Sequence, residues 1–419
     1  MKFKIAYFIY LVISLFYGVV PIYGAITLRH IFTVLMLVVC FYEGGLKLDK
    51  FLKWYLVFMF FYVMIEIDTG YTSTVVNKVL GTYLASIALY LATKIMVKKY
   101  DGGALVIIAL VGLALINSIV AIGQFLDSSI ADTIPEILHI KIPEGDTTEL
   151  FEAEITQKEY VSGLMGIVIS GYFLSATCVL ALYNGRGRIA VYNWIAFAVI
   201  FVALVFVQER SGLAAGAVCT FLFLSIVSIR FRSNMLTIGL VIVIAVYLIN
   251  RYGSQFVSFE DLRYTSMGME DDNRVEHALN ALRWVWHNPY GGASFYYASG
   301  GYYPHNVFAN ALLYGGVFGG MVVIGILMVQ LVKIGQVCLS YIQGKTKSVL
   351  LVVSCMAYLC YTINSFFHNF SLVLGGEMIF LLWAMISSLL DKEGEACDNS
   401  LTKSLRNIKD SLWRYIHES

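Results

Sequence analysis

Charged residues are scarce in this chain: they make up 14% of its 419 residues, and proline occurs only five times. Because a water-soluble globular domain carries about 25% charged residues, the composition excludes an ordinary soluble fold. The low proline content argues against disordered linkers between domains. The net charge of +1, without any basic block, predicts no nucleic-acid partner.

Sequence motifs for metal and nucleotide binding are also missing. The seven cysteines include no CxxC pair and avoid the two long polar loops, so the sequence predicts neither a zinc site nor a disulfide framework. The seven histidines show no HxxxH or HExxH spacing, and the chain has no Walker loop and no GxGxxG fingerprint. We therefore expect a protein without a metal or another cofactor.

Long hydrophobic segments dominate the chain, in which 59% of the residues are hydrophobic. A helix needs about 20 apolar residues to cross a bilayer. The sequence therefore predicts an all-α, polytopic integral membrane protein, with residues 1–419 forming a single membrane domain of about twelve transmembrane helices. The predicted spans lie near residues 5–20, 25–42, 51–66, 79–97, 104–125, 162–183, 189–207, 212–229, 235–250, 306–332, 348–366 and 371–390.

Lys and Arg residues indicate the orientation of these spans, because short cytoplasmic loops are enriched in both. With the N-terminus inside, the inner loops and termini hold twenty of the 29 Lys and Arg residues, and every short inner loop is basic. Lys2 and Lys4 precede an apolar run that lacks an A-x-A site, so the first span is expected to remain uncleaved. Both termini are thus predicted to be cytoplasmic.

Three polar segments accompany the spans. The first long outer loop, 126–161, is acidic, which suits a translocated loop, although a role in gating or acceptor contact stays open. The large outer loop, 251–305, is predicted to be partly helical from Asp272 until Pro289 ends the helix. The tail, 391–419, is predicted to be an amphipathic helix on the cytoplasmic leaflet.

His305 is the first candidate for chemistry, at the predicted outer end of the tenth span. An imidazole at this boundary can accept a proton near neutral pH, as a general base must, or it can be an interfacial side chain without a task. The helix after it carries Gly315-Gly316 and Gly319-Gly320, a spacing that lets helices approach closely.

Arg210 is the second candidate, in the short outer turn after Glu209. Arginine is disfavoured in outer loops, so its presence in a tight hairpin needs a reason. It either pairs with Glu209 or lipid phosphate, or its planar guanidinium binds a diphosphate.

Two further arginines lie on the predicted loop helix. Arg274 either forms an exposed ion pair or binds an anion. Because Arg283 is nine residues further on, the two lie on opposite sides of a helix and are not expected to bind the same group. Glu377, near the outer end of the last span, is a candidate partner for an arginine.

Taken in order, these features resemble the O-antigen ligase and Wzy-type polymerase superfamily. They are an Arg in a short outer turn, a large loop with Arg-x9-Trp leading to Asn-Pro-Tyr-Gly-Gly, and His-Asn-x-Phe before a Gly-rich helix, over about residues 155–320. The resemblance implies a GT-C-like glycosyltransferase of the bacterial inner membrane. Its active site would be periplasmic, and its donor an undecaprenyl-diphosphate-linked oligosaccharide.

The same resemblance implies roles for individual residues. Arg210 and Arg274 match the arginines that hold the lipid diphosphate, with Arg283 as the alternative to Arg274. His305 matches the histidine that activates the acceptor hydroxyl. The family often has serine where this chain has Glu209, which affects the diphosphate pose more than the class. The candidate supporting residues are Glu209, Asn306 and Glu377.

Among the functions open to such a protein, the sequence favours a polymerase that joins repeat units, with a chain-length regulator as a further partner. The alternative is a ligase that transfers finished glycan to a lipid A core or to a protein. An oligosaccharide flippase would place charged residues in the middle of its spans, and here the span centres are nearly free of charge. A scaffold would not need two arginines and a histidine on one face.

We predict that Arg210→Ala, Arg274→Ala and His305→Ala each abolish polysaccharide chain formation, because each removes a group assigned to the reacting diphosphate or hydroxyl. Arg283→Ala should reduce it less. Gel electrophoresis of cell-envelope glycan measures the product, and immunoblotting of membranes checks that protein levels are unchanged. Complete loss with Arg283→Ala and normal product with Arg274→Ala would exchange the roles of these two arginines.

Overall fold

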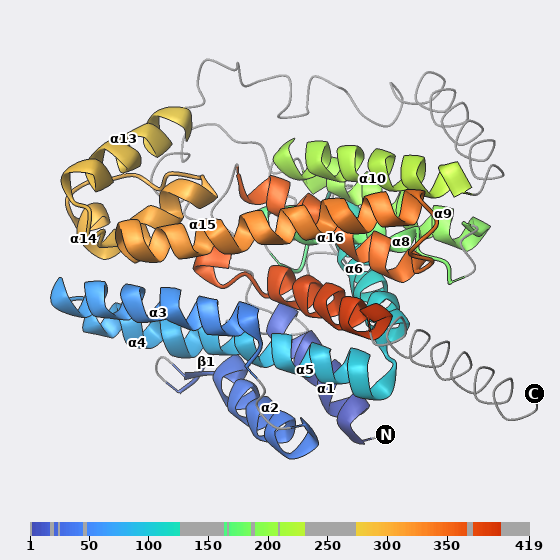
Figure 1. Ribbon diagram of the computed structural model, residues 1–419, viewed down its shortest axis with the longest axis horizontal. Helices are drawn as coiled ribbons and strands as arrows, with labels where there is room; N and C mark the ends of the chain where they lie inside the picture. Colours follow the sequence, from blue (N-terminus) through green and yellow to red (C-terminus); the bar gives the residue numbers. More distant parts are fainter. Residues whose placement is uncertain are drawn as a thin grey trace, which may run out of the picture.

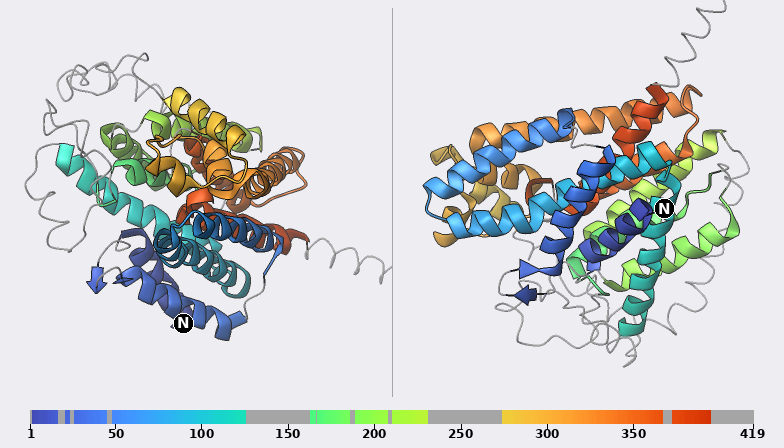
Figure 2. Two further views of the ribbon diagram at one scale, coloured as in Figure 1. Left: turned by 90° about the vertical axis from the view of Figure 1, so that its left-hand side faces the viewer. Right: turned by 90° about the horizontal axis from the view of Figure 1, so that it is seen from below.

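The computed structural model describes residues 2–16, 21–23, 26–44, 48–125, 163–165, 167–185, 189–207, 210–230, 274–366 and 372–394. Most of these residues form α-helices that lie side by side in a bundle (Figure 1). Several helices are seen nearly end-on when the molecule is viewed along its long axis (Figure 2). The predicted helical class is therefore confirmed for the described part of the chain.

The first half of the chain contributes α1 (Lys2–Phe16), α2 (Leu28–Gly44), α3 (Lys50–Asp68), α4 (Thr72–Lys78), the π-helical turn η1 (Val79–Tyr83), α5 (Leu84–Tyr100) and α6 (Gly103–Phe125). The second half contributes α8 (Ile167–Ala181), α9 (Val191–Val207), α10 (Arg210–Arg230), α13 (Arg274–His287), α14 (Ala293–Ala298), α15 (Val307–Ile342), α16 (Val349–Ser365), η5 (Leu372–Leu374) and a helix over residues 377–394. Between α1 and α2, β1 (Pro21–Tyr23) and β2 (Ile26–Thr27) form an antiparallel pair that the all-α prediction did not include.

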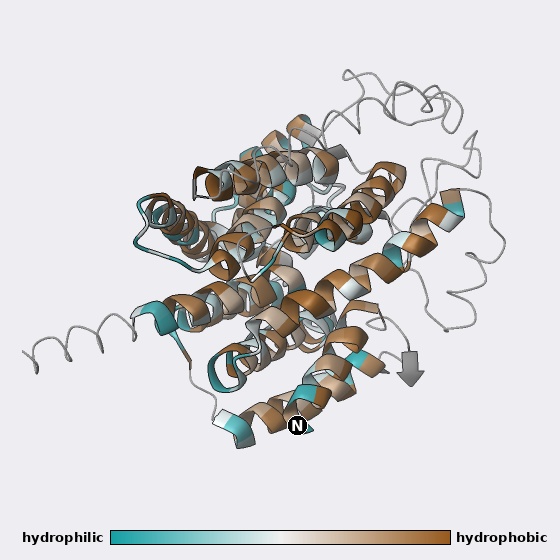
Figure 3. Ribbon diagram, turned by 90° about the vertical axis from the view of Figure 1, so that its right-hand side faces the viewer, coloured by the Kyte–Doolittle hydropathy of each residue, from teal (hydrophilic) through white to brown (hydrophobic). Residues whose placement is uncertain are grey.

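Every predicted span except the one near 235–250, which lies outside the described residues, coincides with a helix. Hydrophobic residues predominate along the helices (Figure 3). These apolar helices indicate a membrane protein. By length and composition, four of the described segments could cross a membrane: Thr72–Tyr100, Gly103–Phe125, Ser211–Ile229 and Val307–Ile342. Three shorter apolar helices accompany them: Ile169–Ala181, Val191–Val207 and Val349–Ser365.

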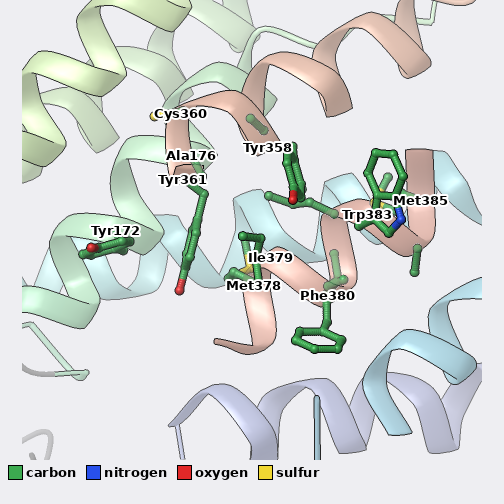
Figure 4. Packing of buried hydrophobic residues seen from close by; sticks show 14 of the residues in the cluster. Tyr172, Ala176, Tyr358, Cys360, Tyr361, Met378, Ile379, Phe380, Trp383 and Met385 are labelled. Carbon is green, nitrogen blue, oxygen red and sulfur yellow. The ribbon is translucent and has the colours of Figure 1, made fainter. Parts of the chain in front are cut away.

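Aromatic side chains fill the interior between α8, α16 and the helix over 377–394. The rings of Tyr172 and Tyr361 pack edge to face with centroids 4.9 Å apart, and the ring of Tyr358 lies 5.6 Å from that of Trp383 (Figure 4). All four side chains are buried. Because such large rings pack in few orientations, they fix α16 relative to its neighbours.

α3 and α15 lie against each other, and glycines allow the close contact. A Cβ added at Gly315 would lie 2.9 Å from the ring of Phe58, and one added at Gly319 would lie 2.9 Å from the Cβ of Phe61. Larger residues would force the helices apart. The close helix approach predicted from the glycine spacing is therefore observed.

α15 is not one straight helix, because the chain reverses direction at Gly316. The φ of 61° and ψ of −172° at this residue are accessible almost only to glycine. A Cβ on Gly320 would lie 2.8 Å from the Cα of Leu312, whereas eight residues of a straight helix rise about 12 Å. Residues 307–315 therefore form a short arm that folds back along a long arm, residues 317–342.

The loop between α13 and α14 occupies the corner made by this reversal. The N–H of Val317 donates a hydrogen bond to the carbonyl oxygen of Pro289, and the N–H of Gly292 donates to that of Leu313, both at 2.9 Å. These bonds satisfy backbone groups that the break leaves without helical partners. The Pro-Tyr-Gly-Gly sequence thus ends α13 as predicted and also secures the reversal.

We predict that Gly316→Ala lowers the free energy of unfolding by at least about 2 kcal/mol, because alanine strongly disfavours this backbone conformation. Its Cβ would also lie 2.4 Å from the carbonyl oxygen of Tyr290. The matched control is Gly325→Ala on the long arm, where no atom lies within 4 Å of the new Cβ.

Thermal unfolding can be followed with a thiol-reactive dye, since Cys40, Cys178 and Cys219 are buried until the protein unfolds. The control should melt at the temperature of the unmodified protein or slightly above it. Equal melting temperatures for the two variants would contradict the reversal.

Candidate functional site

His305 immediately precedes the short arm and is half-buried. Its φ of 41° lies in the left-handed region, which is uncommon for a residue with a Cβ because the side chain crowds the backbone. Such conformations persist only where the surrounding structure imposes them, and they cluster at functional sites. The strained backbone therefore supports the choice of His305 on grounds independent of any motif.

Asn306 forms the N-cap of the short arm. Its Oδ1 accepts hydrogen bonds from the N–H groups of Phe308 and Ala309 at 2.9 and 3.2 Å, which fixes the start of the helix. Its Nδ2 donates to the carbonyl oxygen of Phe366 at 3.4 Å. This predicted supporting residue thus ties the start of the short arm to the end of α16.

The start of α10 is tied to the same end of α16. Ser211 Oγ donates a hydrogen bond to Oδ1 of Asn364, and Nδ2 of Asn364 donates to Oγ of Ser175 at 3.4 Å. The hydroxyl of Tyr172 donates to the carbonyl oxygen of Asn364 at 2.9 Å. α8, α10 and α16 therefore meet in one buried polar network.

Two predicted site residues are brought together by these contacts. Arg210 is the first residue of α10 and is followed by Ser211, while His305 is followed by Asn306. Both following residues bind residues 364–366. The backbones of the predicted cation and the predicted base therefore flank a single helix end, although they are 95 residues apart in the sequence.

The start of α13 also lies close to this region. His277, one turn after Arg274, stacks on Tyr302 with ring centroids 4.8 Å apart and an interplanar angle of 10°. Tyr302 belongs to the short segment that leads into the strained histidine. The side chains of Arg210 and Arg274, and all of Glu209, lie outside the described residues.

Arg283 is exposed on α13, where its Nη1 donates a hydrogen bond to Oδ1 of Asn280 at 3.3 Å. The helical register places position 274 on the other side of α13, together with the buried Ala281 and Val285. Positions 274 and 283 therefore lie on opposite sides of α13, as predicted, and the side chain of Arg283 is exposed.

Glu377 pairs with an arginine, as the sequence suggested, but its partner is Arg29 at the start of α2. Both side chains are largely buried, with 19% and 15% exposure. This ion pair joins α2 to the helix over residues 377–394. It assigns Glu377 a structural contact rather than one with any of the candidate site arginines.

A cavity of about 280 Å³ lies between α13 and the segment from α14 to α15. The ring of Trp284 lies 5.3 Å from that of Tyr296 on its wall. Burial raises the pKa of the Tyr296 hydroxyl, and a hydrogen bond with the backbone of Tyr302 opposes this shift in part. The phenol therefore stays protonated at neutral pH. The lining residues are His277, Asn280, Trp284, Tyr296, Ser299, Gly300, Gly301 and Tyr302.

A second polar cluster, not recognised from the sequence, joins α3 and α4 to α14 and the short arm. Glu66 is fully buried, and its Oε1 accepts a hydrogen bond from the N–H of Ser294 at 3.1 Å. The ammonium of Lys78 lies 3.8 Å from the ring centroid of Tyr314 and 5.9 Å from that of Tyr62. These contacts hold the α3–α4 hairpin against the segment that carries the candidate base.

The sequence contained a weak signal for this cluster. Glu66 and Lys78 are ionisable residues at the edges of apolar runs, where such groups often have a partner or a function. Lys78 is also followed directly by the π-helical turn η1, a feature frequent at functional sites. The contact with Ser294, 228 residues away, could be found only from the packing.

Comparison with protein-family models, with curated proteins and with solved structures found no match. Among the described residues, no group of three or more His, Cys, Asp or Glu side chains could hold a metal ion. The resemblance to the ligase and polymerase superfamily thus stays a hypothesis. The geometry of its own residues is what defines the candidate site.

We predict that His305→Gly is more stable than His305→Ala by about 1 kcal/mol, because glycine adopts the left-handed conformation without crowding from a Cβ. Both variants lack the imidazole, so the comparison isolates the backbone. Thermal unfolding with a thiol-reactive dye gives the difference. An alanine variant as stable as the glycine variant would mean that the backbone at this position is not strained.

Proposed function

We propose that this protein is a membrane glycosyltransferase that joins undecaprenyl-diphosphate-linked oligosaccharide repeat units into an O-antigen or capsular chain. One structural observation carries the proposal beyond the resemblance. The strained His305 and the start of α10, which bears Arg210, are held at the same end of α16. A base and a cation in this arrangement suit transfer from a diphosphate donor.

The chemistry follows from these groups. The acceptor hydroxyl attacks the anomeric carbon while its proton passes to the imidazole of His305. The bond from that carbon to the diphosphate oxygen breaks, and its electron pair leaves with the diphosphate. The guanidiniums of Arg210 and Arg274 stabilise the charge that builds on the leaving group. Attack from the opposite face inverts the anomeric centre.

The proposal extends to the membrane architecture. We infer a GT-C-like protein with twelve spans, both termini in the cytoplasm of a bacterium and the site at the periplasmic face of the inner membrane. The distribution of Lys and Arg supports this orientation. The helices found at the expected positions within the described residues support the number of spans.

The site also favours an enzyme over a flippase. The buried Glu66 lies in the last turn of α3, and Lys78 is the seventh residue of the continuous helical segment Thr72–Tyr100. Each of these ionisable groups is near one end of its helical segment rather than along the middle of a central path, where a transporter would need it. A ligase would use the same donor chemistry with a different acceptor, so the acceptor decides between the two enzymes.

The deciding experiment supplies purified protein in lipid nanodiscs with undecaprenyl-diphosphate repeat units as the only substrate. A polymerase gives a ladder of chain lengths, because each unit serves as donor and acceptor. Arg210→Ala and His305→Ala should each reduce the rate at least about a hundredfold, the usual effect of losing a catalytic proton acceptor or a charge stabiliser.

Tyr42→Ala, at an exposed tyrosine of α2, serves as the control and should keep the rate of the unmodified protein. Product only after lipid A core is added would identify a ligase. No product with either acceptor, from protein that melts normally, would disprove the glycosyltransferase proposal.

A further inference from the structure

The cavity beneath α13 has an unusual lining for a membrane protein of this composition. Four of its residues carry flat rings, namely His277, Trp284, Tyr296 and Tyr302. The polar groups between them come from Asn280, Ser299 and the backbone of the glycines. Among the described residues, the lining includes no Lys, Arg, Asp or Glu side chain.

The side chains that line this cavity favour some classes of ligand over others. The described lining offers no cation for an anion such as a phosphate, and a lipid chain would need a long apolar channel. Flat rings present apolar faces, while an amide and a hydroxyl orient a neutral polar molecule through hydrogen bonds. A pyranose sugar matches both features, because its ring has C–H faces and its edge carries hydroxyls.

The shape of the cavity depends on the loop before the short arm. A Cβ on Gly301 would lie 2.4 Å from the ring of Tyr296, so only glycine lets the loop pass this close. Tyr302 then stacks on His277 and remains 63% exposed, which leaves much of its surface accessible. His277 Nδ1 is buried and has no hydrogen-bond partner among the described residues, so it has capacity for one more bond.

We propose that this cavity is a binding subsite for one neutral pyranose ring, with Tyr302 as the stacking platform and Asn280 as the hydrogen-bonding group. Tyr302 is three residues from His305 in the sequence, so the wall of the cavity continues directly into the segment that carries the candidate base. The sugar chemistry comes from the cavity itself. Its role as a subsite for glycan transfer rests on the proposed function.

Saturation-transfer difference NMR on the full chain in nanodiscs tests the proposal. The probes are the methyl glycosides of glucose, galactose, mannose, rhamnose and N-acetylglucosamine, with glycerol as the neutral control. At least one glycoside should receive magnetisation from the protein, chiefly at the C–H groups of one ring face. An excess of inorganic phosphate should not displace the glycoside from the protein.

Substitutions in the lining test whether the glycoside binds in this cavity. Tyr302→Ala and Asn280→Ala should each weaken glycoside binding about tenfold or more, whereas Tyr42→Ala, at an exposed tyrosine of α2 outside the cavity, should leave the affinity unchanged. Each variant is first checked for an unchanged melting temperature. If no glycoside gives a signal above that of glycerol, or if both cavity variants bind as well as the unmodified protein, the proposal is wrong.

The His305→Ala variant distinguishes the proposed sugar subsite from the proposed glycan transfer. His305→Ala should still bind the glycoside while losing turnover. Glycoside binding without turnover of any lipid-linked donor would retain the sugar subsite and disprove glycan transfer. Turnover that depends on His305, in a protein whose cavity binds no glycoside, would retain glycan transfer and disprove the sugar subsite.

Discussion

Gly316 adopts backbone angles that a residue with a Cβ rarely reaches, and the reversal it permits brings residues 307–315 back along 317–342. The loop before α14 fills the corner and hydrogen-bonds to both arms. If α15 continued straight, the short arm would point away from residues 317–342, and His305 would lie about 13 Å beyond Gly316 instead of back beside the long arm. The reversal therefore determines whether the candidate base can reach the end of α16.

Helix ends in this bundle are joined by polar contacts within an apolar surrounding. Asn306 caps one helix and binds the end of α16, while Asn364 accepts from the start of α10 and donates to α8. In such a medium an unsatisfied polar group is costly, so each contact strongly favours one arrangement. The same contacts hold the backbones of two candidate site residues in place, as a preorganised site requires.

α13 shows which structural features a sequence pattern can predict. Its helical spacing, its end before Pro289 and the opposite placement of two arginines were all predictable, because they depend on local periodicity and on turn residues. The apolar residues that give this helical spacing include Val275 and Trp286, whose exposed fractions are 71% and 86%. The opposite side lines the cavity and packs inward. A single helix cannot reveal which of its faces meets protein.

The sequence by itself determined the helical class and the positions of the apolar helices among the described residues, since apolar run length and spacing are local properties. It did not identify the ion pair between Glu377 and Arg29 or the hydrogen bond from Ser294 to Glu66. Only the tertiary structure decided these pairs and the reversal at Gly316. The two pairs join groups that are distant in the sequence, and the reversal depends on a backbone conformation that neighbouring helices stabilise. The order of residues alone contains neither kind of information.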